Sequence, residues 1–148
     1  MPHNYYTRLL QFAQQFQKYY DRQFLPLLER TGLTMRDVRV LLFLINNPDY
    51  DTAKDITVLR GLSKSQVSQA VDLLAAEGML RRTPDRNDRR VVHLSITPQG
   101  EPLARECQAI QERCSQQLLV GLTPEDQEQF RTYLRTVLDN GIREGAFQ

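Results

Sequence analysis

The chain has 148 residues, a length that fits one domain, or one domain with an assembly element, and excludes two independent enzymatic domains. Its composition is 41% hydrophobic and 25% charged with seven Gly and seven Pro, which excludes disordered, collagenous and disulfide-scaffold chains. The net charge of +1 is unevenly spread, because residues 60–93 carry seven Lys/Arg against four Asp/Glu and residues 101–148 carry five against eight. The basic segment predicts a localised anionic partner.

Nothing in the sequence calls for an oxidising compartment or a membrane. The two cysteines are too few and too close together for a disulfide framework. The first residues lack the pattern of a signal peptide, and no stretch reaches the roughly 18 apolar residues that span a bilayer. We therefore expect a cytoplasmic protein without a membrane partner.

The N-terminal segment predicts one long helix from Tyr5 to Leu28, because apolar side chains recur every three or four residues. These side chains are Tyr5, Leu9, Phe12, Phe16, Tyr19, Tyr20, Phe24 and Leu27. Gly32 ends the helix. A single apolar face of this length requires a partner surface.

Three capping boxes, each a hydroxyl residue followed three positions later by Asp or Gln, predict the starts of the next three helices. The pairs are Thr34 with Asp37, Thr52 with Asp55, and Ser63 with Gln66. Asn47-Pro48, Gly61 and Gly78 end these helices. The third helix is expected to turn Val67, Val71 and Leu74 inward.

The remaining chain predicts a β-hairpin and two more helices. Residues 79–83 and 91–96 have strand character, and the arginine-rich PDRNDRR between them favours a turn. Thr97-Pro98 is expected to cap a fifth helix, and Thr123-Pro124 a sixth that ends near Gly141. Leu103, Cys107, Ile110, Cys114 and Leu118 form the apolar stripe of the fifth helix.

The informative stretch is residues 52–96, where a short helix, a turn, a helix with a small polar outer face and a basic hairpin follow one another. Short hydrogen-bonding side chains allow a helix to enter the major groove of DNA, and arginines on a turn can reach phosphates or a narrow minor groove. The candidate DNA-binding residues are Lys64, Ser65, Gln66, Ser68, Gln69, Arg86, Arg89 and Arg90. Each feature alone is equally typical of a solvated surface, but their combination within about 40 residues is more specific.

The run LRGLSKSQVSQAVDLLAAEGMLRRTPDRNDRRVVHLSITPQG resembles the core of the MarR family of winged helix-turn-helix regulators. The D-x-R wing signature is present as Asp88-Arg89-Arg90, and the L-T-x-x-G motif as Ile96-Thr97-Pro98-Gln99-Gly100, with Ile in place of Leu. The resemblance implies that Arg90 enters the minor groove, that Asp88 orients the wing, and that the base-reading residues are Ser65, Gln66, Ser68 and Gln69.

The resemblance extends to the whole chain and implies a mainly α subunit over residues 1–148. Its DNA-binding lobe is expected at residues 34–96, and its dimerisation helices at 5–30 and 98–142. Such a homodimer would bind a pseudo-palindromic operator and, as a repressor, would be released by a small-molecule effector. A winged-helix protein-interaction module without DNA binding is the alternative, which the arginine-rich wing disfavours.

No catalytic site, metal site or cofactor is expected. The sequence lacks a phosphate-binding loop, a nucleophile elbow and a cluster of metal ligands at suitable spacing. His3 and His93 are isolated in sequence, and His93 is expected on the solvent side of the hairpin. A non-enzymatic protein is therefore predicted.

The cysteines and one aromatic cluster leave alternatives open. Cys107 and Cys114 lie on the apolar stripe, which favours buried packing over the oxidation-sensing thiols of some relatives. Aromatic side chains around one cation could line a pocket for a small aromatic or phenolic ligand, although ordinary helix packing is the simpler interpretation. This cluster consists of Phe16, Tyr19, Tyr20, Arg39 and Phe43.

Overall fold

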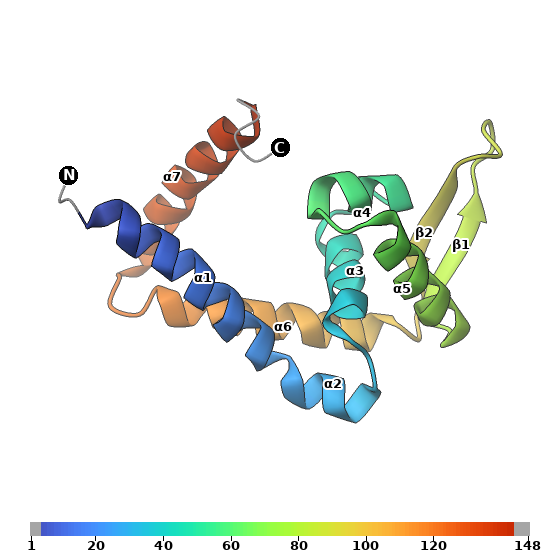
Figure 1. Cartoon of the computed structure of the whole chain (residues 1–148), viewed down its shortest axis with the longest axis horizontal. Helices are drawn as coiled ribbons and strands as arrows, with labels where there is room; N and C mark the ends of the chain where they lie inside the picture. The colour runs from blue at the N-terminus through green and yellow to red at the C-terminus, as the bar shows by residue number, and fades with distance from the viewer. Residues whose placement is uncertain (1–3, 144–148) are drawn as a thin grey trace. The chain divides into compact units, whose positions relative to one another are not determined.

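The computed structural model describes residues 4–143 of the chain. Its helices are α1 (Tyr5–Gln23), α2 (Leu25–Thr31), α3 (Met35–Asn46), α4 (Ala53–Arg60), α5 (Lys64–Ala76), α6 (Glu101–Leu118) and α7 (Pro124–Arg143) (Figure 1). Its strands are β1 (Leu80–Pro84) and β2 (Val92–Ile96). The mainly α fold with a small hairpin is as predicted. The chain divides into two compact units, one up to Glu112 and one from Arg113.

The predicted single N-terminal helix is wrong, because the structure breaks it at Phe24 into α1 and α2. Pro26 lies in the first turn of α2. Proline has no N–H to donate and its ring crowds the carbonyl four residues earlier, so a continuous helix through Arg22 is disfavoured. Phe24, at the break, is completely buried. The apolar periodicity continues across Pro26, a residue that helices tolerate only near their start, so periodicity alone did not reveal the break.

All three predicted capping boxes are present at the starts of α3, α4 and α5. In α3 the Asp37 carboxylate accepts the Thr34 N–H at 2.9 Å and its hydroxyl at 3.0 Å. In α4 and α5 the exchange is reciprocal, with distances of 3.0–3.1 Å between Thr52 and Asp55 and between Ser63 and Gln66. These bonds satisfy N–H groups that have no partner within a helix.

The DNA-binding lobe expected from the sequence has its own hydrophobic core, built from α3, α4, α5 and the hairpin. Val67, Val71 and Leu74 of α5 are buried as predicted, and Leu80 and Leu94 close the core from the two strands. Burying each such aliphatic side chain contributes about 1.5–3 kcal/mol. The core thus holds α5 with one face inward and the other exposed.

A second cluster joins α2, α3 and the first part of α6. It contains Phe24, Leu27, Val38, Leu42 and Cys107, all at most 4% exposed. Since α3 contributes to both clusters, it connects the lobe to the N-terminal helices within the first unit.

The hairpin is antiparallel, with Leu80 opposite Ile96 and Pro84 opposite Val92. Its base is fixed by Thr97, whose hydroxyl donates to the Gly78 carbonyl at 2.6 Å and accepts the Gly100 N–H at 3.1 Å. A turn therefore occupies residues 98–100, and α6 begins at Glu101. The expected helix start at Pro98 is three residues too early.

The second unit contains α7, which starts after Thr123 as predicted and runs through Gly141 to Arg143. The Thr123 hydroxyl accepts the Asp126 N–H at 3.1 Å. One face of this helix exposes large apolar side chains, namely Phe130, Tyr133, Leu134, Val137 and Leu138. Among the described residues no helix is long and apolar enough to cross a membrane.

Candidate nucleic-acid interface

The outer face of α5 carries the predicted base-contacting residues. Lys64, Ser65, Gln66, Ser68 and Gln69 are all exposed, whereas the opposite face of the helix is buried in the lobe core. The capping box at Ser63 fixes where the helix begins. The structure therefore brings these five residues together on one solvent-facing surface.

Two glutamines on this surface already have partners. The Gln66 side-chain oxygen accepts the Ser63 N–H at 3.0 Å, so this oxygen is committed to the cap. The Gln69 side-chain oxygen accepts from Arg36 Nη1 at 2.7 Å, and its amide nitrogen lies 3.4 Å from Ser65 Oγ. Because arginine can only donate, Gln69 must turn its oxygen toward Arg36.

Arg36, on the first turn of α3, is a site residue that the sequence analysis missed. Its guanidinium also contacts the fully buried Asp37 carboxylate at 3.0 Å. Asp37 in turn caps α3 through Thr34. No local sequence signal pairs residues 33 positions apart, since tertiary packing of α3 on α5 creates this contact.

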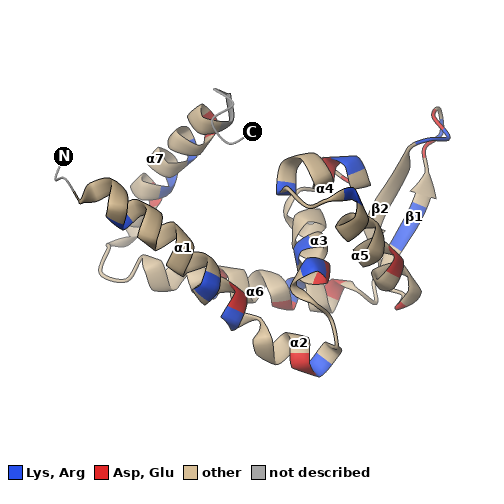
Figure 2. Ribbon diagram, viewed as in Figure 1, with Lys and Arg blue, Asp and Glu red and all other residues tan. Residues whose placement is uncertain are grey.

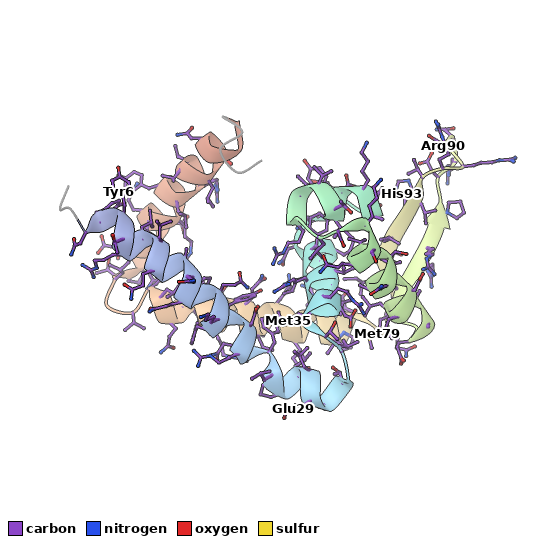
Figure 3. All side chains as sticks on the ribbon, viewed as in Figure 1. Tyr6, Glu29, Met35, Met79, Arg90 and His93 are labelled. Carbon is purple, nitrogen blue, oxygen red and sulfur yellow. The ribbon has the colours of Figure 1, made fainter. Side chains whose placement is uncertain are left out.

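The wing tip is organised by two aspartates. Asp85 accepts the N–H groups of Asn87 and Asp88, each at 2.9 Å. Asp88 accepts the Arg90 N–H at 2.9 Å and the guanidinium at 3.2 and 3.3 Å. These bonds from Arg90 lower the pKa of Asp88. The Arg90 side chain remains 91% exposed at the tip, where Figure 3 labels it.

Further cations lie around these two elements (Figure 2). A hollow of about 390 Å³ between α4, α5 and the hairpin is lined by Lys54, Lys64 and Arg82. Arg82 is paired with Asp72, and Arg86 and Arg89 on the tip are exposed. Lys54 and Arg82 were not among the predicted residues, since neither falls on the outer face of α5 or on the turn.

His93 faces away from the buried Leu94 beside it on β2, which agrees with the expected solvent side of the hairpin, but it is not free in solvent. Its ring is only 38% exposed and contacts two carboxylates, Asp51 through Nδ1 and Asp85 through Nε2, each at 2.7 Å. The residue is isolated in sequence but not in space. The other histidine, His3, lies outside the described residues. Across residues 4–143 no group of three His, Cys, Asp or Glu side chains could hold a metal ion.

The predicted effector cluster is partly assembled. Tyr20, Arg39 and Phe43 line a hollow of about 200 Å³, while Phe16 and Tyr19 do not. The Phe16 ring packs on Tyr20 with centroids 6.0 Å apart. The sequence analysis missed the other lining residues, Leu42, Asn46, Asn47, Arg60 and Gln111.

Of the two arginines that line this hollow, Arg39 is incompletely hydrogen-bonded. Arg39 contacts the Asp21 carboxylate at 3.4 Å, and its buried Nε has no hydrogen-bond partner among the residues described. Gln111 donates to the Tyr20 hydroxyl at 2.9 Å and accepts from Asn46 at 2.9 Å. An anionic group entering the hollow would meet the guanidinium groups of Arg39 and Arg60.

Both cysteines are buried, as predicted, with exposed fractions of 0% for Cys107 and 2% for Cys114. Burial raises the pKa of the Cys107 thiol to about 11 and also raises that of Cys114. A thiol of raised pKa is a poor nucleophile at neutral pH. These positions therefore lack the exposure and the thiolate character that oxidation sensing requires.

A capped helix pair followed by an antiparallel hairpin with a basic tip defines a winged helix-turn-helix protein. Residues 31–91 match the sequence model of the MarR family. Over its winged helix-turn-helix region the chain is therefore similar to the MarR family.

Two curated relatives match over part of their length. The uncharacterised HTH-type regulator YwaE of Bacillus subtilis is 30% identical over 87 residues, which are 59% of this chain and 51% of that protein. The transcriptional repressor MprA of Escherichia coli K12 is 29% identical over 84 residues, 57% and 48% of the two chains. The match thus spans about half the length of these relatives.

Solved structures share the fold over nearly the whole chain. A MarR regulator from Methanosarcina mazei has a TM-score of 0.75 at 17% identity, covering 93% of this chain and 98% of that one. MepR of Staphylococcus aureus in a DNA complex has a TM-score of 0.63 at 22% identity, and the match covers 95% of this chain and 98% of MepR. BpsR of Bordetella bronchiseptica has a TM-score of 0.63 at 22% identity, and the match covers 88% of this chain and 98% of BpsR. The DNA binding of BpsR is regulated by 6-hydroxynicotinic acid.

Proposed function

We propose that this protein is a sequence-specific DNA-binding transcriptional regulator, acting as a homodimer and as a repressor that a small effector releases. The observation that carries the proposal is the exposed polar face of α5 beside a wing whose Arg90 is held by Asp88 and points into solvent. Acting on DNA also implies the cytoplasmic location expected from the sequence.

On this proposal α5 lies in the major groove and the wing in the adjacent minor groove. Its 13 residues make α5 about 20 Å long, enough to present one face to several base pairs. Ser65, Ser68 and Gln69 would contact base edges, and Lys64 phosphates. Arg86, Arg89 and Arg90 would be attracted by the negative potential of the minor groove.

Unpartnered apolar faces support the homodimer. No residue of α1 is buried, although the helix carries large apolar side chains, of which Tyr5, Tyr6, Leu9, Leu10 and Phe12 are exposed. In the second unit, α7 exposes a comparable set. Apolar faces of this kind mark interaction surfaces. We assign dimerisation to segments 5–30 and 98–142, and DNA binding to residues 34–96.

Repression and effector release rest on two further points. The relative MprA is a transcriptional repressor, and the DNA binding of BpsR responds to a small aromatic acid. The hollow lined by Tyr20, Arg39 and Phe43 offers aromatic surface and, with Arg60, two cations. A small aromatic or phenolic anion is the ligand class that this chemistry would bind.

Selection of binding sites from a random pool of duplexes by the purified protein tests the proposal. We expect enrichment of an inverted repeat whose half-sites lie about 10–10.5 base pairs apart, as two α5 helices of a symmetric dimer require. The log of affinity should fall with log salt at about 0.9 per phosphate contacted. A flat salt dependence without enrichment would instead indicate a protein-interaction module.

A further inference from the structure

The strongest unexplained group in the lobe is His93, which joins two segments that are distant in sequence. It lies on β2, on the side of the hairpin nearer to α4 (Figure 3). Asp51 comes from the segment before α4, and Asp85 begins the turn after β1. Both carboxylates lie 2.7 Å from ring nitrogens. The side chain therefore connects the wing to the body of the lobe.

The chemistry of the three groups requires an imidazolium. An ionised carboxylate only accepts hydrogen bonds, and a neutral imidazole has one N–H, so both contacts are satisfied only when both ring nitrogens are protonated. In agreement, the contact with Asp85, followed by that with Asp51, raises the pKa of His93. The same contact with His93, together with the hydrogen bonds donated by the Asn87 and Asp88 N–H groups, lowers the pKa of Asp85 to about 2.

The two aspartates are held by different parts of the lobe, Asp51 beside α4 and Asp85 in the wing. Asp51 also accepts the Leu94 N–H through its backbone oxygen at 2.7 Å, and the next residue, Thr52, forms a bridge with His93 and caps α4. Asp85 sits at the root of the turn and binds the backbone of the wing tip. A change at His93 would therefore act on the position of the whole tip.

We propose that His93 is a positioning residue of the wing, whose imidazolium bridges Asp51 and Asp85 and so sets where the tip arginines meet DNA. This inference rests on the proposed DNA-binding function. In this proposal the tip arginines contact DNA, and His93 acts on their position through Asp85 and Asp88. We call this arrangement of Asp51, His93 and Asp85 the wing clamp.

The other charges near the wing clamp are accounted for by their places in the hairpin and in α4. Arg81 shares the face of the hairpin that bears His93, because its partner Ser95 lies two residues along β2. Arg82 lies on the opposite face and pairs with Asp72. Asp55 of α4 caps Thr52. The side chains that α3 contributes to the core cluster containing Leu94 are apolar and add no charge there.

The clamp has a defined pH dependence. Because the pKa of His93 is raised in the fold, its contribution is complete below the unfolded value of 6.5 and is lost as pH rises through the higher folded value. At the acid end the contact between His93 and Asp85 lasts until Asp85 is protonated, near its pKa of about 2. Wing positioning should therefore weaken from neutral toward alkaline pH.

The test uses the full chain with His3→Gln, so that His93 is the sole imidazole. His93→Gln removes the imidazolium, Asp85→Asn removes one partner, and Glu101→Gln is the control, because Glu101 pairs with Arg105 outside the wing. NMR titration of the free protein gives the pKa of His93. Anisotropy of a labelled mixed-sequence duplex of about 30 base pairs at low salt gives affinity from about pH 5.5 to 9.

We expect the pKa of His93 above 6.5, and closer to 6.5 in Asp85→Asn. Affinity of the parent and of Glu101→Gln should fall about two- to fivefold through that pKa, the size of a solvent-exposed ion pair, while His93→Gln is weaker at low pH and shows no step. An unshifted pKa, or the same step in His93→Gln, with DNA binding intact would overturn the clamp alone. Absence of binding by every protein at every pH would overturn the proposed function.

Discussion

At the scale of single residues, Gln69 shows how a partner changes what a side chain can recognise. A free glutamine can pair with adenine through both its oxygen and its nitrogen. With its oxygen held by Arg36 at 2.7 Å, Gln69 would offer DNA only its N–H groups. In this state it matches acceptors such as guanine O6 or thymine O4 rather than the N7 acceptor and N6 donor of adenine together.

We therefore expect Gln69→Ala and Arg36→Ala to alter the same positions of the selected operator. Gln69→Ala should lose about 1–3 kcal/mol of discrimination at one base pair per half-site. Arg36→Ala should relax that position toward adenine, because it frees the oxygen of Gln69. Competition binding with operators changed at single positions measures both effects, and changes at unrelated base pairs would contradict the assignment.

Arg90 has a different role at the same scale, because its guanidinium lies in solvent on the wing. Arg90→Ala should weaken operator and mixed-sequence DNA alike and reduce the salt slope by about one. Titrations of both duplexes at several salt concentrations provide the measurement. Selective loss of operator binding would show that Arg90 reads bases instead.

At the scale of elements, local signals in the sequence were enough to place most helix starts. Hydroxyl residues with Asp or Gln three positions later begin α3, α4 and α5, because capping is a contact within one turn. The break at Phe24 followed from Pro26, which periodicity ignored. The pairing of His93 with Asp51 was not predictable, since residues 42 positions apart meet only after folding.

The cap of α3 should be the more costly one to remove. Asp37 is fully buried and binds both Thr34 and Arg36, whereas Asp55 in the cap of α4 is partly exposed. Asp37→Ala should lower the free energy of unfolding by about 2–3 kcal/mol, and Asp55→Ala by about 1 kcal/mol. Urea denaturation at one fixed protein concentration compares them, and equal losses would deny a special role for the buried carboxylate.

At the scale of the whole molecule, the proposed dimer requires the exposed apolar face of α7. Val137, on that face, is 63% exposed. Val137→Asp should shift sedimentation equilibrium toward monomer, because it puts a charge into an apolar interface. Thr132→Asp adds the same charge five residues earlier, on the opposite side of the helix, and should leave assembly unchanged. A parent protein that is a stable monomer at micromolar concentration would contradict the dimer.

The position of α3 has a consequence for the energetics of regulation. Arg36 reaches Gln69 on α5, the helix that we propose faces DNA, and Arg39, less than one turn later, lines the hollow proposed for the effector. A ligand and an operator would thus act on the same turn of one helix. Thermodynamic reciprocity then requires that the factor by which a bound ligand lowers affinity for DNA is also the factor by which bound DNA lowers affinity for the ligand. The promoter itself would set the concentration at which the cell's signal is sensed.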